Sequence, residues 1–98
     1  MIELEKGSER LIPMEITRRQ KEIDFTVESV NCEVYNTLGT LVESGVGTFE
    51  GHQIYYFLDT SQAIYEVGKI YTVCFSVTIV GLNKVIKGAR RIKIITCY

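Results

Sequence analysis

Apolar and polar residues alternate with a period of two along most of the chain. In the clearest stretch, Ile70 to Val80, apolar or aromatic residues occupy the odd positions from 71 to 79, and Thr, Cys or Ser the even positions between them. Successive side chains of a strand point to opposite faces, so this pattern predicts a strand with one face on a core and one in water. The same alternation predicts strands at 12–16, 30–35 and 91–94, and the outward-facing Pro13 places its strand at a sheet edge.

Short segments rich in glycine or asparagine separate these stretches. They occur at 36–39, 50–53 and 81–83, and loops of this length and composition typically join antiparallel strands as hairpins. Gly88-Ala89 predicts a bulge in the last strand, and the glycines at 45 and 47 predict a bulge or a strand crossing. Residues 61–66 are compatible with one short helical turn, but no window favours a long helix.

These patterns predict one all-β domain spanning residues 1–98, with about seven strands. A chain of this length buries roughly 65% of its unfolded surface, which is enough for a core without a metal or disulfide scaffold. We expect an immunoglobulin-like (Ig-like) antiparallel β-sandwich. A small β-barrel is the alternative that the sequence leaves open.

One segment, Gly68 to Val73, has a glycine turn followed by a tyrosine at the start of a strand. In Ig-like domains a tyrosine at this point hydrogen-bonds back to the preceding loop, and we expect this of Tyr71. Together with the strand-turn-strand segment 34–45 and the tyrosine-rich segment 54–59, it makes most of the chain (about 25–94) resemble the small Ig-like β-sandwich proteins encoded among the virion-structure genes of tailed phages and prophages.

This resemblance implies a non-enzymatic particle component or decoration, and it carries no catalytic motif to transfer. The chain departs from antibody domains in two respects: it has no tryptophan, and Val73 stands where those domains have a cysteine. Cys32 is predicted to face inward and Cys74 outward, so we expect no disulfide between them. Reduced thiols are typical of an intracellular compartment.

Charge is unevenly distributed along the chain. All twelve acidic residues lie between Glu3 and Glu66, whereas residues 67–98 contain six Lys or Arg and no acid. We expect acidic strands to lie beside basic ones and neutralise them. The alternative is a head-to-tail contact between copies, which builds rings or arrays. A basic surface is a further prediction, made of Arg18, Arg19, Lys21, Arg90, Arg91 and Lys93, but nucleic acid is not an expected partner because no aromatic residue lies among the last cations.

The adjacent Tyr55 and Tyr56 must face opposite sides of a strand. If Tyr56 joins the core, Tyr55 and Phe57 point outward and, with Tyr35, form an apolar patch of the kind that contacts partners. Alternatively, the connection 59–69 covers one of these aromatics. The predicted interaction surface therefore consists of Tyr35, Tyr55, Phe57, Arg90, Arg91 and Lys93.

We predict no catalytic, cofactor or metal site. Three cysteines without C-x-x-C spacing and a single histidine do not supply a zinc ligand set. The glycines of segment 45–51 lack the spacing and the following helix of a dinucleotide site. Glu3, Glu5 and Glu9 are expected to face solvent rather than to form an acid–base pair in a cleft.

We therefore expect a non-enzymatic structural or protein–protein interaction module, a phage or prophage particle component that contacts proteins and self-associates. The alternative is a carbohydrate- or ligand-binding β-sandwich that uses exposed tyrosines. The first residues lack the basic and then apolar run of a signal peptide, and no apolar stretch approaches the ~20 residues that span a bilayer. A cytoplasmic protein, incorporated into a virion in the phage case, is the expectation.

Overall fold

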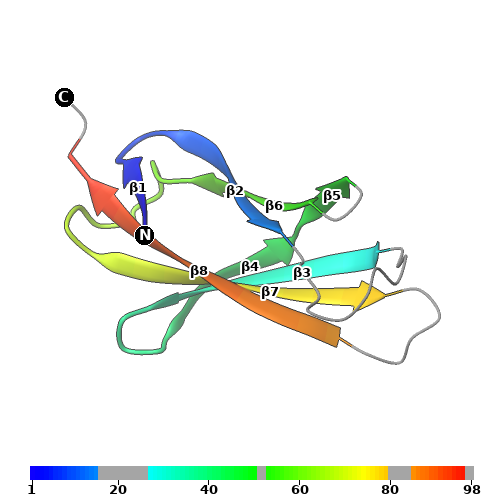
Figure 1. The fold of residues 1–98 in the computed structure, drawn as a ribbon. Coiled ribbons are helices and arrows are strands. Elements are labelled where there is room, and N and C mark those ends of the chain that lie inside the picture. The colour runs from blue at the N-terminus through cyan, green and yellow to red at the C-terminus, as the bar shows by residue number, and fades with distance from the viewer. Residues whose placement is uncertain (16–26, 51–52, 80–84, 97–98) are drawn as a thin grey trace.

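The computed structural model describes residues 1–15, 27–50, 53–79 and 85–96, which form strands and turns and contain no helix (Figure 1). The predicted all-β class is confirmed, and the described part of the chain has eight strands instead of about seven. Residues 61–66 form turns, so the short helical turn considered for them is absent. The strands are β1 (Ile2–Glu5), β2 (Glu9–Glu15), β3 (Val27–Asn36), β4 (Leu41–Val46), β5 (Thr48–Glu50), β6 (Gln53–Asp59), β7 (Ile70–Ile79) and β8 (Val85–Ile95).

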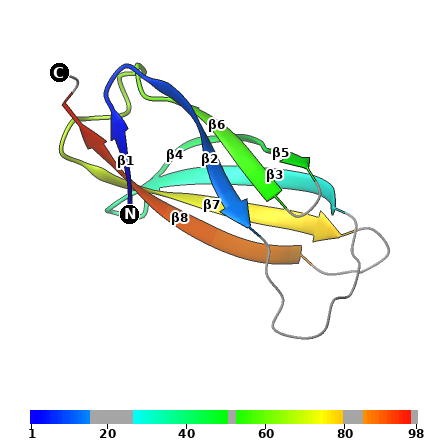
Figure 2. The same cartoon turned by 45° about the horizontal axis from the view of Figure 1, so that its top comes forward.

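The strands are divided between two sheets that face each other as layers (Figure 2). The five-stranded sheet has the order β1-β8-β7-β3-β4, and the three-stranded sheet has the order β2-β6-β5. Every neighbouring pair is antiparallel except β1 and β8, which are parallel. The sheets do not close into a barrel, so the barrel alternative is wrong.

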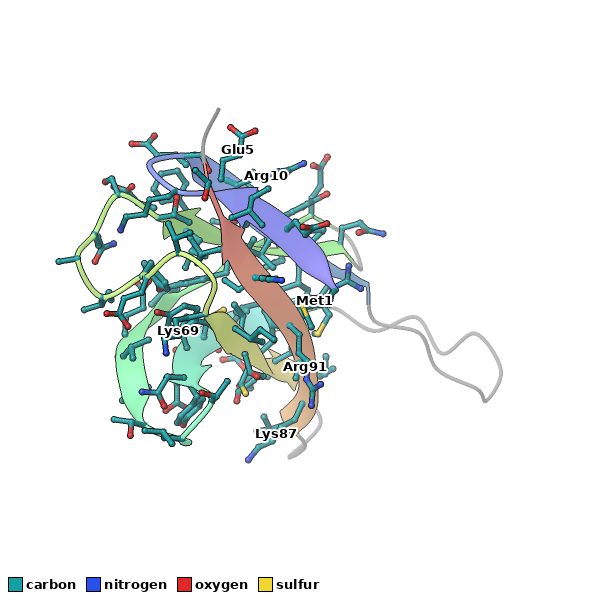
Figure 3. All side chains as sticks on the ribbon, turned by 90° about the vertical axis from the view of Figure 1, so that its left-hand side faces the viewer. Met1, Glu5, Arg10, Lys69, Lys87 and Arg91 are labelled. Carbon is teal, nitrogen blue, oxygen red and sulfur yellow. The ribbon has the colours of Figure 1, made fainter. Side chains whose placement is uncertain are left out.

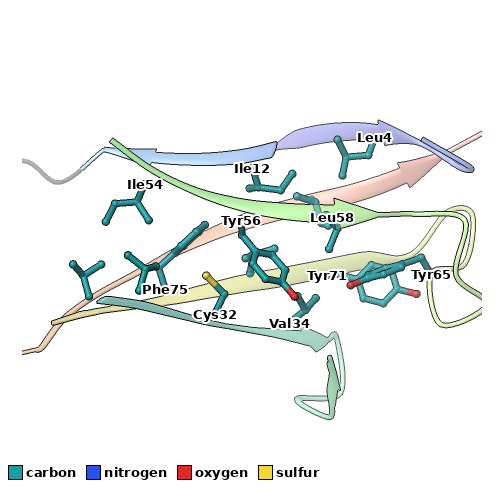
Figure 4. Close-up of a cluster of buried hydrophobic side chains, with 14 of the residues drawn as sticks. Leu4, Ile12, Cys32, Val34, Ile54, Tyr56, Leu58, Tyr65, Tyr71 and Phe75 are labelled. Carbon is teal, nitrogen blue, oxygen red and sulfur yellow. The ribbon is translucent and has the colours of Figure 1, made fainter. Parts of the chain in front are cut away.

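The core lies between the two sheets and follows the alternation of the strands (Figure 4). Every odd position of β7 from 71 to 79 is buried, as its pattern predicts, and the residues of β3 at 30, 32 and 34 are buried with them. The three-stranded sheet contributes Ile12, Ile54, Tyr56 and Leu58 from the opposite side. Burial of these apolar surfaces is the main force that holds the layers together.

The predicted turns and edges agree with the pairing of the strands. The antiparallel pairs β3–β4, β5–β6 and β7–β8 confirm the three hairpins, although the connecting residues 51–52 and 80–84 lie outside the described residues. In the first hairpin, the Asn36 side-chain oxygen accepts hydrogen bonds from the N–H groups of Leu38 and Thr40, at 2.9 and 3.0 Å. Pro13 is exposed on β2, an edge strand of its sheet, as expected.

Gly47 lies where the chain leaves the five-stranded sheet at the end of β4 and enters the three-stranded sheet at β5. A Cβ atom on Gly47 would lie 2.7 Å from Cγ1 of Val30 and 2.9 Å from the backbone oxygen of Tyr55. Only glycine fits so close an approach, which confirms the predicted strand crossing.

The bulge predicted at Gly88-Ala89 is wrong, because the β7–β8 register is continuous from Ile70 opposite Lys93 to Thr78 opposite Val85. Gly88 instead leaves room for Met14 of the facing sheet, whose sulfur would collide with a Cβ atom at this position. A glycine required for packing between sheets has the same sequence signature as a bulge.

Tyr71 fastens the connection between β6 and β7 to the core. Its hydroxyl group donates a hydrogen bond to the carbonyl oxygen of Ile64 and accepts one from the N–H of Glu66, both at 2.9 Å. The Tyr71 ring also packs edge-on against the buried ring of Tyr65, with centroids 5.1 Å apart. The hydrogen bonds expected of Tyr71 are therefore confirmed.

Candidate functional site

The outer face of the three-stranded sheet carries a contiguous apolar strip. The β2–β6 register places Leu11 opposite Phe57 and Pro13 opposite Tyr55, and these four residues are called the apolar strip below. Phe57 is 56% exposed and Leu11 52% exposed. Tyr56 faces the core at 5% exposure, so the predicted division of neighbouring aromatics between the two faces of β6 is confirmed. The connection 59–69 leaves Phe57 exposed, which excludes the alternative that it covers this ring.

Carboxylates flank the apolar strip at both ends. Glu9 and Asp59 are opposite one another at one end, and Glu50 is opposite Gln53 at the other. The Asp59 carboxylate accepts hydrogen bonds from the hydroxyl and N–H groups of Ser61, at 2.6 and 2.9 Å, and these bonds lower its pKa. Asp59 is therefore held in position as an anion beside the strip.

The six residues predicted as one surface lie on different faces. Tyr35, Arg91 and Lys93 are on the outer face of the five-stranded sheet, because β3 and β8 belong to that sheet. The prediction that Tyr35 joins Tyr55 and Phe57 is wrong, since β6 belongs to the other sheet. Arg90 is exposed, but it points to the opposite side of β8 from Arg91. It therefore lies neither with Tyr35, Arg91 and Lys93 nor with Tyr55 and Phe57.

A shallow groove of about 440 Å³ crosses the outer face of the five-stranded sheet over β3, β7 and β8. Its lining includes the small side chains of Cys74, Ser76 and Ala89, with Glu33 and Lys87 also at its margins. The Tyr35 hydroxyl group donates a 2.8 Å hydrogen bond to Glu33, which raises the Tyr35 pKa and keeps the phenol protonated.

Exposed cations lie along β8, and one of them, Lys87, lines the groove; Figure 3 labels Lys87 and Arg91. Lys87, Arg91 and Lys93 share one face of β8, with Ala89 between the first two. The sequence prediction omitted Lys87, although the period of two along β8 already places it in line with Arg91.

Among the residues that the structure describes, an acidic residue lies directly beside a β8 cation only at one end of the strand. The parallel pairing with β1 places Glu3 beside Lys93. On β7, however, the neighbours of Arg91 and Lys87 are the uncharged Thr72 and Ser76, because β1 pairs only with the last part of β8. The expected acidic neighbour is therefore present for Lys93 and absent from the adjacent strand β7 for Arg91. Lys87 also has no acidic neighbour on β7, although Glu33 of β3 lines the same groove. The predicted basic residues Arg18, Arg19 and Lys21 lie outside the described residues.

Glu43 forms a polar cluster at the margin of the core. Its carboxylate accepts hydrogen bonds from the hydroxyl groups of Tyr56, at 2.9 Å, and Tyr65. Burial raises the pKa of Glu43, and burial together with the bond to Glu43 raises that of Tyr56 well above its ordinary value. Because the two phenols are themselves buried, we assign this cluster to the stability of the fold.

The cysteines of the described chain are free, with Cys32 buried and Cys74 half-buried on opposite faces of their sheet, as expected. Burial raises the pKa of the Cys32 thiol to about 12, which makes it a poor nucleophile. Within the residues described, no group of three or more His, Cys, Asp or Glu side chains is arranged to hold a metal ion. The same residues contain no helix with the length and hydropathy needed to cross a membrane.

Comparison of the chain with protein-family models, with curated proteins and with solved structures finds no match.

Proposed function

We propose that this chain is a non-enzymatic protein-interaction module built on an Ig-like sandwich. Two features support the Ig-like architecture. The order β2-β6-β5 corresponds to strands B, E and D of such domains, and β8-β7-β3 corresponds to G, F and C. Tyr71, at the start of β7, makes the hydrogen bonds of a tyrosine corner.

The observation that carries the functional proposal is the apolar strip. Its two most exposed members, Leu11 and Phe57, are direct neighbours across two strands, so they form one surface and not scattered apolar contacts with water. Contiguous exposed apolar residues with a charged rim are typical of protein contact sites. Incorporation into a phage or prophage particle after assembly in the cytoplasm is part of the proposal, supported by the sequence resemblance alone.

Photo-crosslinking tests the role of the strip. A photoreactive phenylalanine analogue replaces Phe57 in one variant and Leu38 in a control, because Leu38 is 88% exposed in the β3–β4 turn, away from the strip. We expect protein adducts, with a second copy or with another polypeptide, from position 57 and far fewer from position 38. Equal yields from the two positions would contradict a contact site at the strip.

Carbohydrate binding is the second candidate, because the exposed Phe57 ring and the half-buried Tyr55 ring lie on the same face of β6 and resemble a stacking platform. A glycan array of the wild-type protein and the Tyr55→Ala variant separates the two functions. Glycan binding that Tyr55→Ala abolishes would favour the carbohydrate candidate. No binding by the wild type removes it.

A further inference from the structure

The outer faces of the two sheets are complementary in shape and charge. The apolar strip presents the exposed side chains of Leu11 and Phe57, with carboxylates at both ends. The five-stranded sheet presents a groove lined by small side chains, with Lys87 at its margin and Arg91 further along the same strand. One face therefore has protruding apolar groups and anions, whereas the other has a recess with cations along β8 and one carboxylate, Glu33, on its β3 side.

The spacing of these groups along their strands also agrees. Asp59 is two residues from Phe57 on β6, and Lys87 and Arg91 are each two residues from Ala89 on β8. At a rise of about 3.3 Å per residue, both separations are about 7 Å. With the Phe57 ring seated over Ala89 and β6 of one copy aligned with β8 of the other, the Asp59 carboxylate would lie level with one of the two cations.

We propose that the outer face of the three-stranded sheet of one copy docks on the outer face of the five-stranded sheet of a second copy, with Phe57 in the groove and carboxylates opposite Lys87 and Arg91. This inference rests on the proposed contact role of the apolar strip and adds the identity of its occupant. The two surfaces differ and belong to different sheets, so each docked copy keeps one free surface. The contact then propagates as a stack of copies or closes into a ring.

Charge favours a second copy as the occupant. The described outward-facing residues of the three-stranded sheet include Glu9, Asp59 and Glu50 but no Lys or Arg. Lys87 and Arg91 have uncharged neighbours on β7, so a carboxylate from another molecule is a suitable partner for them. The outer face of the five-stranded sheet also carries Glu3 and Glu33, so the charge complementarity is local. The anions beside the strip match the two cations of β8, and such a match favours a head-to-tail contact.

The size of the smaller face limits the area that the contact can bury. Three strands of up to seven residues, about 4.8 Å apart, make a face of roughly 20 by 15 Å. This is well below the ~800 Å² that each partner buries in a standard interface. We therefore expect a weak contact between any two copies and a stable array only where many copies are concentrated.

Paired variants test the proposal by light scattering coupled to size exclusion. One variant, Lys87→Glu with Arg91→Glu, damages the groove surface; the other, Leu11→Ser with Phe57→Ser, damages the strip. Between about 10 μM and about 1 mM, we expect the mass of the wild-type protein to rise with concentration and to fall with added salt. Each variant alone should remain a monomer. Their equimolar mixture should form a dimer and nothing larger, because it contains one intact surface of each kind.

A matched control carries the same change of net charge elsewhere. Lys69→Glu with Arg10→Glu replaces two exposed cations that belong to neither surface, because Lys69 precedes β7 and Arg10 has the opposite parity to Leu11 on β2. This variant should associate as the wild type does. A wild-type protein that stays monomeric would overturn the proposal, as would self-association of the groove variant or failure of the mixture to associate. The wild type could also be monomeric while the photoreactive variant at position 57 crosslinks to a different polypeptide. That result would overturn the second copy as the occupant of the strip and would leave the proposed function standing.

Discussion

Replacing Tyr71 with phenylalanine removes one oxygen atom and keeps the ring that packs against Tyr65. That oxygen accounts for two hydrogen bonds to the backbone of the β6–β7 connection, both at 2.9 Å, and the Tyr71 side chain is only 3% exposed. A single intramolecular hydrogen bond contributes about 1 kcal/mol net. Tyr71→Phe should therefore lower the free energy of unfolding by about 2 kcal/mol, from a total that is typically about 5–15 kcal/mol.

Urea denaturation followed by far-UV circular dichroism measures this loss. With a slope of about 2 kcal/mol per molar, the midpoint should fall by about 1 M. Thermal unfolding should shift downward by roughly 10 °C for a domain of this size. The slope of the unfolding free energy against urea concentration should be unchanged, because the variant exposes no additional surface on unfolding.

Tyr35→Phe is the matched control. Its hydroxyl group also makes a 2.8 Å hydrogen bond, but to the Glu33 side chain on the half-exposed outer face of the sheet. Water replaces that bond readily, so the expected loss is below about 0.5 kcal/mol. If Tyr71→Phe loses no more stability than Tyr35→Phe, the corner does not hold the connection in the way that the hydrogen bonds indicate.

Two further substitutions test the strand crossing and the polar cluster. Gly47→Ala should lower the free energy of unfolding by about 1–3 kcal/mol, because the added Cβ atom lies closer to Val30 and to a backbone oxygen than van der Waals contact allows. A urea midpoint equal to that of the wild type would refute this prediction. Burial raises the pKa of Glu43 in the folded state, so its stabilising contribution is present at low pH and is lost as pH rises through that pKa. The free energy of unfolding of the wild type should therefore fall relative to that of Glu43→Gln as the pH rises from about 4 to about 7. A difference between the two proteins that is constant or that changes in the other direction contradicts the assignment.

Part of the candidate site could be predicted from local pattern. The outward positions of Tyr55 and Phe57 follow from the adjacency of Tyr55 and Tyr56 on one strand, and the structure agrees. Leu11 was missed because it joins Phe57 only through the β2–β6 register, which connects residues 46 positions apart in the chain. Such a pairing leaves no signal in either segment alone.

The sequence by itself determined which side of β2, β3, β7 and β8 is buried, because a period of two is a local property and the apolar side of the strand is the one that packs on the core. It also determined the turns, the edge position of Pro13 and the hydrogen-bonding role of Tyr71. Only the tertiary structure decided how the strands are shared between two sheets, and hence that Tyr35 and Phe57 lie on different faces. It also decided the parallel pairing of β1 with β8 and the fit of Met14 over Gly88. These features depend on contacts between distant segments, whose geometry is set when the two layers pack together.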